Sequence, residues 1–194
     1  MPITVVIVAY VIGSIPFALI VARRRGTDLR EVGSGNLGAA NVMRSSGVYA
    51  GAMVAALDMA KGAASVWLAA RMSDGAGLPA AAGCAAIIGH VYPIWLRFRG
   101  GKGVATACGV FGMLTPMALP PALAIFAATV WATKYISLGS VLASMALPPI
   151  AYALGSPAPA VVAAAAAAVV IVFRHRSNVL RLRMGTERRL GAGA

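Results

Sequence analysis

Charged residues are scarce in this chain. Asp, Glu, Lys and Arg make up 11% of its 194 residues, whereas a soluble domain of this size carries about 25%. Five residues are acidic, and 60% of the chain is hydrophobic. No water-soluble core of this length could bury so much apolar sequence, so a soluble globular protein is excluded.

Cysteine is also rare, and acidic residues are too few to balance the basic ones. Cys84 and Cys108 lie in apolar stretches without CxxC or histidine spacing, which indicates packing residues. The net charge of +12 is concentrated in short clusters between apolar blocks. This distribution is typical of topology signals and anion sites, and we expect no nucleic-acid partner.

Long apolar blocks predict an all-α integral membrane protein with about seven transmembrane helices. The blocks cover about 3–22, 48–70, 78–96 and the nearly unbroken stretch 104–173. We divide the last block at Thr115-Pro116, at Thr133-Lys134 and at Gly155-Ser-Pro. Segment 104–114 is short for a full crossing, so we expect it to be tilted, broken or partly buried in protein. Six spans is the main alternative.

The basic residues predict the orientation. If the N-terminus is outside and the sides alternate, every basic residue except Arg71 and Lys61 falls on the cytoplasmic side. With six spans one basic cluster would be stranded on the wrong side. The positive-inside rule therefore favours an outside N-terminus and a cytoplasmic C-terminus. The first span lacks a basic n-region and precedes Arg23–Arg25, which indicates a retained helix rather than a signal peptide.

A glycine-rich motif, GSGNLGAAN, covers residues 33–41 in the first cytoplasmic loop, about 23–47. Dense glycine lets backbone N–H groups turn inward and bind an anion, and Arg44 can pair with a phosphate. The alternative is a flexible loop, which would be richer in Ser and Glu and would not need two spaced asparagines. The candidate ligands are Gly33, Ser34, Gly35, Asn36, Gly38, Asn41 and Arg44. Ser34 is also a candidate nucleophile, but it would need an adjacent base.

A second motif follows the third span, in a predicted loop at 97–106. Its GGKG sequence, residues 100–103, is typical of a phosphate cradle. It is not a Walker A loop, because Arg97 stands at the first required glycine and Gly103 at the required Ser or Thr. Residues 103–106 should begin the next helix, with free N–H groups facing an anion. The candidate ligands are Gly100, Gly101, Lys102, Gly103 and Thr106.

His90 lies at the cytoplasmic end of the third span. A lone histidine on an apolar helix is often structural, but ionisable groups in a membrane are candidate functional residues. A His-x-x-x-x-Asp acyltransferase mechanism is excluded here, because Trp95 stands at the aspartate position. In the second span Asp58 and Lys61 share a helix face and should neutralise each other, and a contact of Lys61 with a substrate is the alternative.

A third motif lies in the basic tail, about 174–194. Such a tail anchors topology and binds anionic lipid headgroups. That role does not explain Asn178 and Glu187, so the tail can also contribute residues to the anion site.

These three motifs resemble those of the bacterial acyl-phosphate:glycerol-3-phosphate acyltransferases, the PlsY family. The family pattern contains G-S-G-N-x-G-A-T-N, then G-H-x-x-P-x-F-x-x-F-x-G-G-K-G-V-A-T, then R-H-x-x-N-x-x-R-L-x-x-G-x-E. This chain matches nearly all of these positions, in order and over essentially its whole length. Ala40 replaces the usual Thr, and Trp95 replaces an aromatic Phe.

The resemblance implies one transmembrane acyltransferase domain, residues 1–194, in the bacterial inner membrane with its active site facing the cytoplasm. It implies transfer of a fatty acyl group from acyl phosphate to the 1-hydroxyl of sn-glycerol 3-phosphate, which gives lysophosphatidic acid and inorganic phosphate. No metal or cofactor is expected. We expect a monomer in membrane lipid, with an acyl-phosphate-producing enzyme as functional partner.

The resemblance also implies a role for each group of candidate residues. The two glycine-rich loops would hold the two phosphates, in an order that the sequence leaves open, and Asn178 and Arg181 would close the site. His90 would place or deprotonate the attacking hydroxyl, although a substrate phosphate oxygen could take the proton instead. The main alternative function is a membrane transporter of a small phosphorylated or anionic solute, and a structural membrane subunit is a second.

Overall fold

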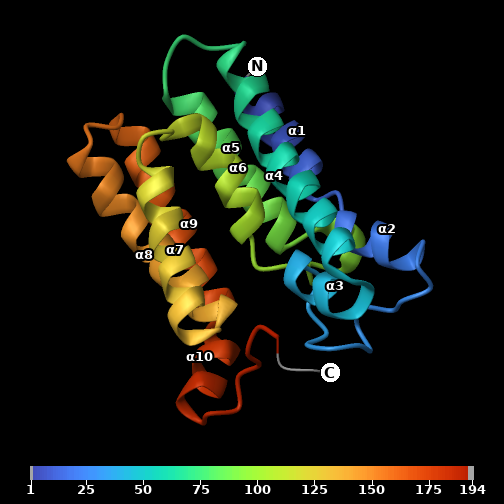
Figure 1. The fold of residues 1–194 in the computed structure, drawn as a ribbon. Helices are drawn as coiled ribbons and strands as arrows, with labels where there is room; N and C mark the ends of the chain where they lie inside the picture. The colour runs from blue at the N-terminus through green and yellow to red at the C-terminus, as the bar shows by residue number, and fades with distance from the viewer. Residues whose placement is uncertain (1, 192–194) are drawn as a thin grey trace. The chain divides into compact units, whose positions relative to one another are not determined.

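The computed structural model describes residues 2–191, so residue 1 and positions 192–194 of the predicted tail lie outside the described part. Within residues 2–191 every regular element is a helix, as the sequence predicts (Figure 1). The chain divides into two compact units, Met1–Leu114 and Thr115–Ala194, here called the N-terminal and C-terminal units. The N-terminal unit contains α1 (Pro2–Gly13), α2 (Phe17–Arg23), α3 (Ala39–Ser46), α4 (Val48–Ala70), α5 (Gly77–Val91), the short 3₁₀ helix η1 (Ile94–Leu96) and α6 (Val104–Leu114). The C-terminal unit contains α7 (Leu119–Thr133), α8 (Ile136–Ala153), α9 (Ala158–Arg174) and α10 (Arg176–Arg183).

The first apolar span is broken near its end. α1 stops before Ser14, and α2 starts after Pro16. Proline cannot donate to the helix ladder and restricts the residue before it, so the Ile15-Pro16 sequence accounts for the break. Residues 2–23 together are still long and apolar enough to cross a membrane. The sequence predicts the extent of this span but not its interruption.

Glycine lets the helices of the N-terminal unit lie in close contact. α4 packs along α6, and α1 packs along α5. A Cβ on Gly109 of α6 would overlap the carbonyl oxygen of Met59 on α4. A Cβ on Gly13 of α1 would likewise overlap the backbone of Ala86 on α5. The backbones therefore approach each other without intervening side chains, as small residues allow in membrane bundles.

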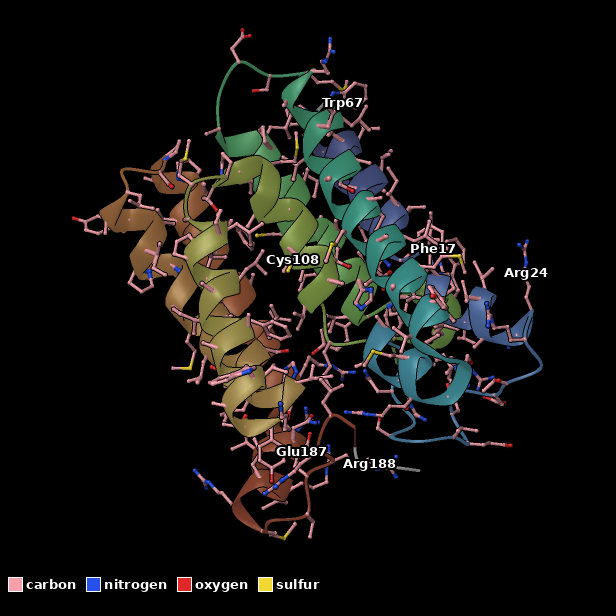
Figure 2. All side chains as sticks on the ribbon, in the orientation of Figure 1. Phe17, Arg24, Trp67, Cys108, Glu187 and Arg188 are labelled. Carbon is pink, nitrogen blue, oxygen red and sulfur yellow. The ribbon has the colours of Figure 1, made fainter. Side chains whose placement is uncertain are left out.

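Short helices and loops gather at the start of α4. Both α2 and α3 pack against this end of α4 (Figure 1). Leu29 and Leu37, from the loop between α2 and α3, are buried in a small apolar core with Val42 and Val54. This core anchors the loop that carries the first glycine-rich motif. In Figure 2 the side chain of Arg24, the residue after α2, projects outward.

The C-terminal unit is built from consecutive helices that pack side by side. α8 contacts α7 and α9, and α10 bends away from α9 by 54° at His175. The face that α9 buries is mostly alanine, whose small side chain allows close helix contacts. The buried alanines of α9 are Ala160, Ala163, Ala164, Ala167 and Ala168.

The predicted division of residues 104–173 is confirmed. α6 ends at Leu114, α7 ends at Thr133, and α8 and α9 are separated by residues 154–157. Within the described residues, four helical segments are long and apolar enough to cross a membrane, and α9 with α10 makes a fifth if the bent pair counts as one span. The remaining apolar helices, α6 and α7, are shorter than a full crossing. The four segments are 2–23, 48–70, 77–96 and 136–153.

The contact between α4 and α6 gives a first testable prediction. Gly109→Ala should lower stability by about 1–3 kcal/mol, because its methyl group would overlap the Met59 carbonyl and force the helices apart. Gly77→Ala is the matched control, since a Cβ at Gly77 meets no atom within 4 Å. Thermal unfolding in detergent measures both. Equal midpoints for the two variants would contradict the close contact.

Candidate active site

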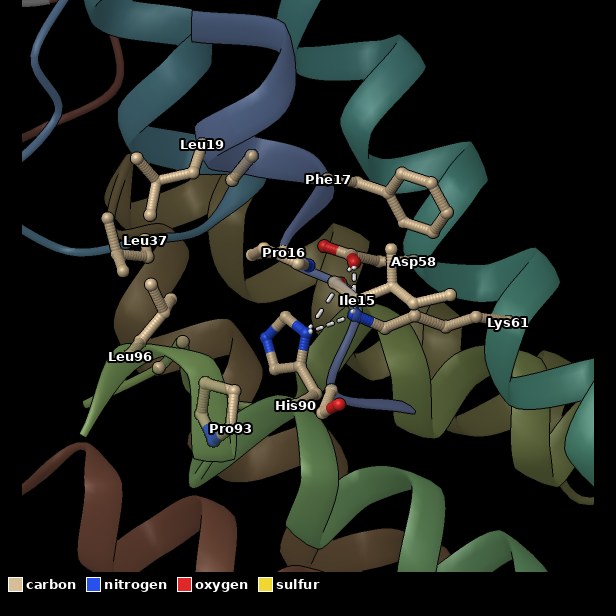
Figure 3. A pocket seen from close by; sticks show the side chains of 14 residues that line it. Ile15, Pro16, Phe17, Leu19, Leu37, Asp58, Lys61, His90, Pro93 and Leu96 are labelled. Atoms are coloured by element: carbon tan, nitrogen blue, oxygen red, sulfur yellow. Dashed lines mark hydrogen bonds and ion pairs between the residues drawn. The ribbon is translucent and has the colours of Figure 1, made fainter. Parts of the chain in front are cut away.

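A buried ion pair lies beside the break in the first span. Asp58 and Lys61 are one turn apart on α4, and their charged atoms Oδ1 and Nζ are 2.7 Å apart. This confirms the predicted pairing. The Lys61 ammonium also donates to the carbonyl oxygen of Ile15 at 2.9 Å, and it lies 3.0 Å from Nδ1 of His90 (Figure 3). The break in the first span thus supplies a backbone hydrogen-bond acceptor, the Ile15 carbonyl oxygen, to the buried Lys61 ammonium of α4.

His90 is in the last turn of α5 and is 8% exposed. Its Nδ1 faces the ion pair, at 3.5 Å from the Asp58 carboxylate. The other edge of the ring faces Gly101, because a Cβ built there would overlap Nε2. The same Cβ would lie 2.8 Å from the carbonyl oxygen of Leu37. His90 therefore lies between the ion pair on one side and both glycine-rich segments on the other.

The second glycine-rich segment folds back on the end of α5. The backbone N–H of Gly100 donates to the Val91 carbonyl at 3.0 Å, and that of Gly101 donates to the His90 carbonyl at 3.2 Å. Gly103 has a φ of 88°, a left-handed conformation that favours glycine. α6 begins at the next residue, as the sequence predicts. This geometry presents the first N–H groups of α6 next to the loop.

Lys102 and Thr106 flank the start of α6. The Lys102 side chain is partly buried, whereas Thr106 is completely buried. The Thr106 hydroxyl oxygen has no hydrogen-bond partner among the described residues. The predicted contact of each side chain with a substrate stays a prediction.

The first glycine-rich segment is held by Asn41, at the start of α3. Its amide nitrogen donates to the carbonyl oxygens of Leu29 and Val32, at 3.2 and 3.1 Å. Its amide oxygen accepts from the backbone N–H of Ser34 at 3.0 Å and from the Ser34 hydroxyl at 3.3 Å. The side chain is 1% exposed. Asn41 therefore supports the loop from within, and its predicted contact with a substrate stays a prediction.

The same loop exposes its glycines. Gly33 and Gly35 have φ values of 67° and 66°, so both take the left-handed conformation. Arg44 is exposed in the last turn of α3, and Asn36 is partly buried beside Gly38. Their role as phosphate ligands stays a prediction.

Ser34 lacks the partner that a nucleophile requires. Its hydroxyl donates to the amide oxygen of Asn41, and an amide oxygen is not a general base near neutral pH. The local geometry therefore gives no support for a covalent acyl-serine intermediate.

Both glycine-rich segments meet at one pocket of the N-terminal unit. The pocket is small and lies around His90 (Figure 3). Residues of the first-span break, of the ion pair and of both glycine-rich segments line it. The lining includes Ile15, Pro16, Phe17, Leu37, Asp58, Lys61, His90, Pro93, Gly100 and Gly101.

The sequence did not identify Ile15 or the contact between Lys61 and His90. The proline in an otherwise apolar span is the signal that could have identified the break. Trp95, which replaces Phe of the family pattern, also contacts this break: its indole N–H donates to the Ser14 hydroxyl at 2.7 Å. A phenylalanine could not make this hydrogen bond.

In the C-terminal unit, the tail motif is organised by Glu187. Its carboxylate accepts from Asn178 at 2.6 Å, from the Arg181 Nε at 2.7 Å and from the Ser137 hydroxyl at 2.7 Å. Burial raises the pKa of the Glu187 carboxyl, but these hydrogen bonds and the Arg181 charge outweigh burial and hold the pKa below its ordinary 4.5. Glu187 thus joins α10 to the start of α8. The substrate contacts predicted for Asn178 and Arg181 stay predictions.

The Glu187 contacts predict a pH-dependent stability. Because the folded-state pKa is lowered, the ionised carboxylate stabilises the fold above pH 4.5, and this contribution is lost as the pH falls through the folded-state value. The difference in thermal midpoint between wild type and Glu187→Gln should therefore be constant from pH 7 to about 5.5 and shrink at lower pH. Glu31→Gln, at an exposed position, is the matched control. A difference that does not change down to pH 3.5 would contradict the prediction.

The sequence and fold of this chain are similar to those of known proteins. The sequence model of the family described as "Glycerol-3-phosphate acyltransferase" matches residues 3–185. The glycerol-3-phosphate acyltransferase of Roseobacter denitrificans is 44% identical over 187 residues, which cover 95% of this chain and 92% of that protein. The protein of the same name from Geobacter sulfurreducens is 44% identical over 185 residues, which cover 95% of each chain.

Two solved structures have the same fold. One is PlsY (YgiH), an integral membrane glycerol 3-phosphate acyltransferase, in its glycerol 3-phosphate form, with a TM-score of 0.94 and 36% identity. That match covers 98% of this chain and 96% of the other. The lysophosphatidic acid form has a TM-score of 0.91 and 34% identity, with 98% and 95% of the chains covered. The family model, the relatives and the solved structures agree, and this chain is an integral membrane protein of the glycerol-3-phosphate acyltransferase (PlsY) family.

Proposed function

We propose that this protein transfers a fatty acyl group from acyl phosphate to the 1-hydroxyl of sn-glycerol 3-phosphate, which yields lysophosphatidic acid and inorganic phosphate. The observation that supports this most directly is the meeting of two glycine-rich, basic segments around His90 within one unit. The reaction involves two phosphate-bearing substrates, and the two segments offer separate sets of backbone N–H donors. Family membership supports the same substrates.

The proposed phosphate ligands come from both segments. Gly33, Gly35, Asn36 and Gly38 would bind one phosphate together with Arg44. In the second segment, Lys102, Gly103 and the first N–H groups of α6 would bind the other phosphate, and Gly100 and Gly101, whose own N–H groups donate to the end of α5, would shape the loop around it. Guanidinium and ammonium groups bind phosphate through charge-assisted hydrogen bonds. The acyl chain would lie among apolar helices, where each buried methylene contributes about 0.8 kcal/mol.

The proposed chemistry is direct transfer without a covalent enzyme intermediate. The glycerol hydroxyl oxygen attacks the acyl carbonyl carbon and forms the ester bond. The bond between that carbon and the bridging phosphate oxygen breaks, and inorganic phosphate leaves. We assign the hydroxyl proton to a phosphate oxygen, because Nδ1 of His90 already faces the Lys61 ammonium. Cations and N–H groups fixed in advance would stabilise the charge that develops on the carbonyl oxygen.

We also propose the finer topology. The protein would cross the bacterial inner membrane seven times, with its N-terminus outside and with the C-terminus and active site on the cytoplasmic side. The positive-inside distribution of arginine and lysine supports this orientation. α6 and α7 would be the two short crossings. The two units would act as one monomeric acyltransferase domain, because the family model extends across both. An acyl-phosphate-producing enzyme would supply the donor.

Purified protein in detergent tests the function. Incubated with acyl phosphate and labelled glycerol 3-phosphate, it should release lysophosphatidic acid and inorganic phosphate in equal amounts. Acyl-CoA should not replace acyl phosphate as donor. If folded protein forms no product but moves labelled glycerol 3-phosphate into vesicles, the transporter alternative replaces the proposal.

Lys102 provides a sharper test of the phosphate subsites. Lys102→Met should lower kcat/KM about 10- to 150-fold, which corresponds to losing a hydrogen bond to a charged group of about 1.5–3 kcal/mol. Lys134→Met is the matched control, because Lys134 is exposed in the turn between α7 and α8. A Lys102→Met protein that keeps kcat/KM within twofold of wild type would remove Lys102 from the proposed site.

A further inference from the structure

The Lys61 ammonium has one ion-pair partner and two hydrogen-bond partners. It carries three N–H bonds and faces the Asp58 carboxylate, the Ile15 carbonyl oxygen and Nδ1 of His90, all within 3.0 Å. Lys61 is 4% exposed and Asp58 is 1% exposed. A substrate phosphate could reach this ammonium only by displacing one of the three acceptors. Lys61 is therefore placed to hold protein groups rather than substrate.

The contact with Lys61 also determines the proton position on His90. An ammonium group can only donate, so Nδ1 accepts from Lys61, and a ring with a single proton then carries that proton on Nε2. The distances agree with this assignment. Nδ1 is 3.0 Å from the Lys61 Nζ but 3.5 Å from the Asp58 oxygen, which exceeds the usual range of about 2.7–3.2 Å for an N–H donor.

The protonated edge of His90 faces the two glycine-rich segments. Nε2 lies against Gly101, and the Leu37 carbonyl oxygen lies on the same side of Gly101. The backbone of Gly101 is itself bonded to the His90 carbonyl. A rotation of the imidazole ring would therefore disturb the contact between residue 101 of one segment and residue 37 of the other.

We propose that Asp58 and Lys61 are positioning residues for the acyl-transfer site. Together they hold His90 as the Nε2–H tautomer, and the fixed ring holds residues 100–103 against the loop that carries Leu37. The proposal rests on the proposed function, because the two segments are the proposed phosphate-binding loops. His90 is then a positioning residue and not the general base, since Nδ1 is occupied by Lys61 and Nε2 carries a proton.

The competing explanation is a purely structural ion pair. Removing one partner from a buried pair leaves an uncompensated charge and destabilises a protein strongly, whereas replacing both partners is often neutral. A purely structural pair therefore predicts that Asp58→Asn/Lys61→Met recovers both stability and activity. The positioning role predicts that this double variant recovers stability alone, because His90 still lacks its donor.

Histidine NMR tests the tautomer independently of activity. The chain has two histidines, so a ¹⁵N-histidine-labelled sample gives two ring systems, and His175→Gln assigns the His90 signals. We expect the Nε2–H pattern for wild type. In Lys61→Met we expect the Nδ1–H pattern, because Asp58 then becomes the remaining acceptor for that nitrogen. A wild-type ring with its proton on Nδ1, or charged, would overturn the proposal.

Kinetics on the double variant test the consequence. Asp58→Asn/Lys61→Met should unfold within a few degrees of wild type and show a KM at least tenfold higher for one of the two substrates, with a smaller change in kcat. Asp74→Asn/Lys134→Met, at exposed positions, is the matched control. Both KM values within twofold of wild type would overturn the positioning role. A double variant that unfolds far below wild type would also overturn it, because the pair would then be needed for the fold itself.

The two proposals fail in different ways. If wild-type protein shows no acyl transfer at all, the proposed function is wrong, and the histidine spectrum still decides whether Lys61 fixes the ring. If wild type is active and the spectrum shows another tautomer, the proposed function stands and the positioning role is wrong.

Discussion

The buried ammonium of Lys61 constrains the architecture around it. A charge among apolar helices is tolerated only when it is paired and hydrogen-bonded. Asp58, one turn earlier on α4, supplies the opposite charge. The carbonyls of α4 are engaged in their own helix, so further acceptors must come from elsewhere. The broken first span provides one at Ile15, and α5 provides another at His90. The helix break and the histidine thus serve the same electrostatic requirement.

Close backbone packing makes those contacts possible. A Cβ on Gly89 would overlap the carbonyl oxygen of Tyr10, and Gly13 lies equally close to Ala86. α1 and α5 therefore lie almost backbone to backbone just before the break, and this brings Ile15 and His90 to the same side of α4. A larger side chain at either glycine would move the two acceptors apart. The fit between helices determines the distances on which the site depends.

The features that the sequence predicts well are local ones. Apolar blocks and their breaks follow from composition, the start of α6 follows from a glycine before a helical run, and the Asp58–Lys61 pair follows from helical spacing. The contact of Lys61 with His90 joins residues 29 positions apart, so it depends on how two helices dock. The role of Asn41 depends likewise on where α3 packs, because the same amide could face a phosphate or the loop behind it. Spacing alone does not distinguish these arrangements.

The N-terminal unit places its cations in two different environments. Lys61 is neutralised by Asp58 behind the glycine-rich segments, whereas Arg44 is exposed and Lys102 is partly buried on the segments themselves. A buried cation without a partner would attract phosphate into the helix bundle, away from the acyl carbonyl. The paired lysine adds no net charge there, so it can fix the backbone without competing for substrate. In the proposed reaction, Arg44 and Lys102 therefore attract the two phosphates. Asp58, Lys61 and His90, which lie behind them, fix the positions of the two glycine-rich segments.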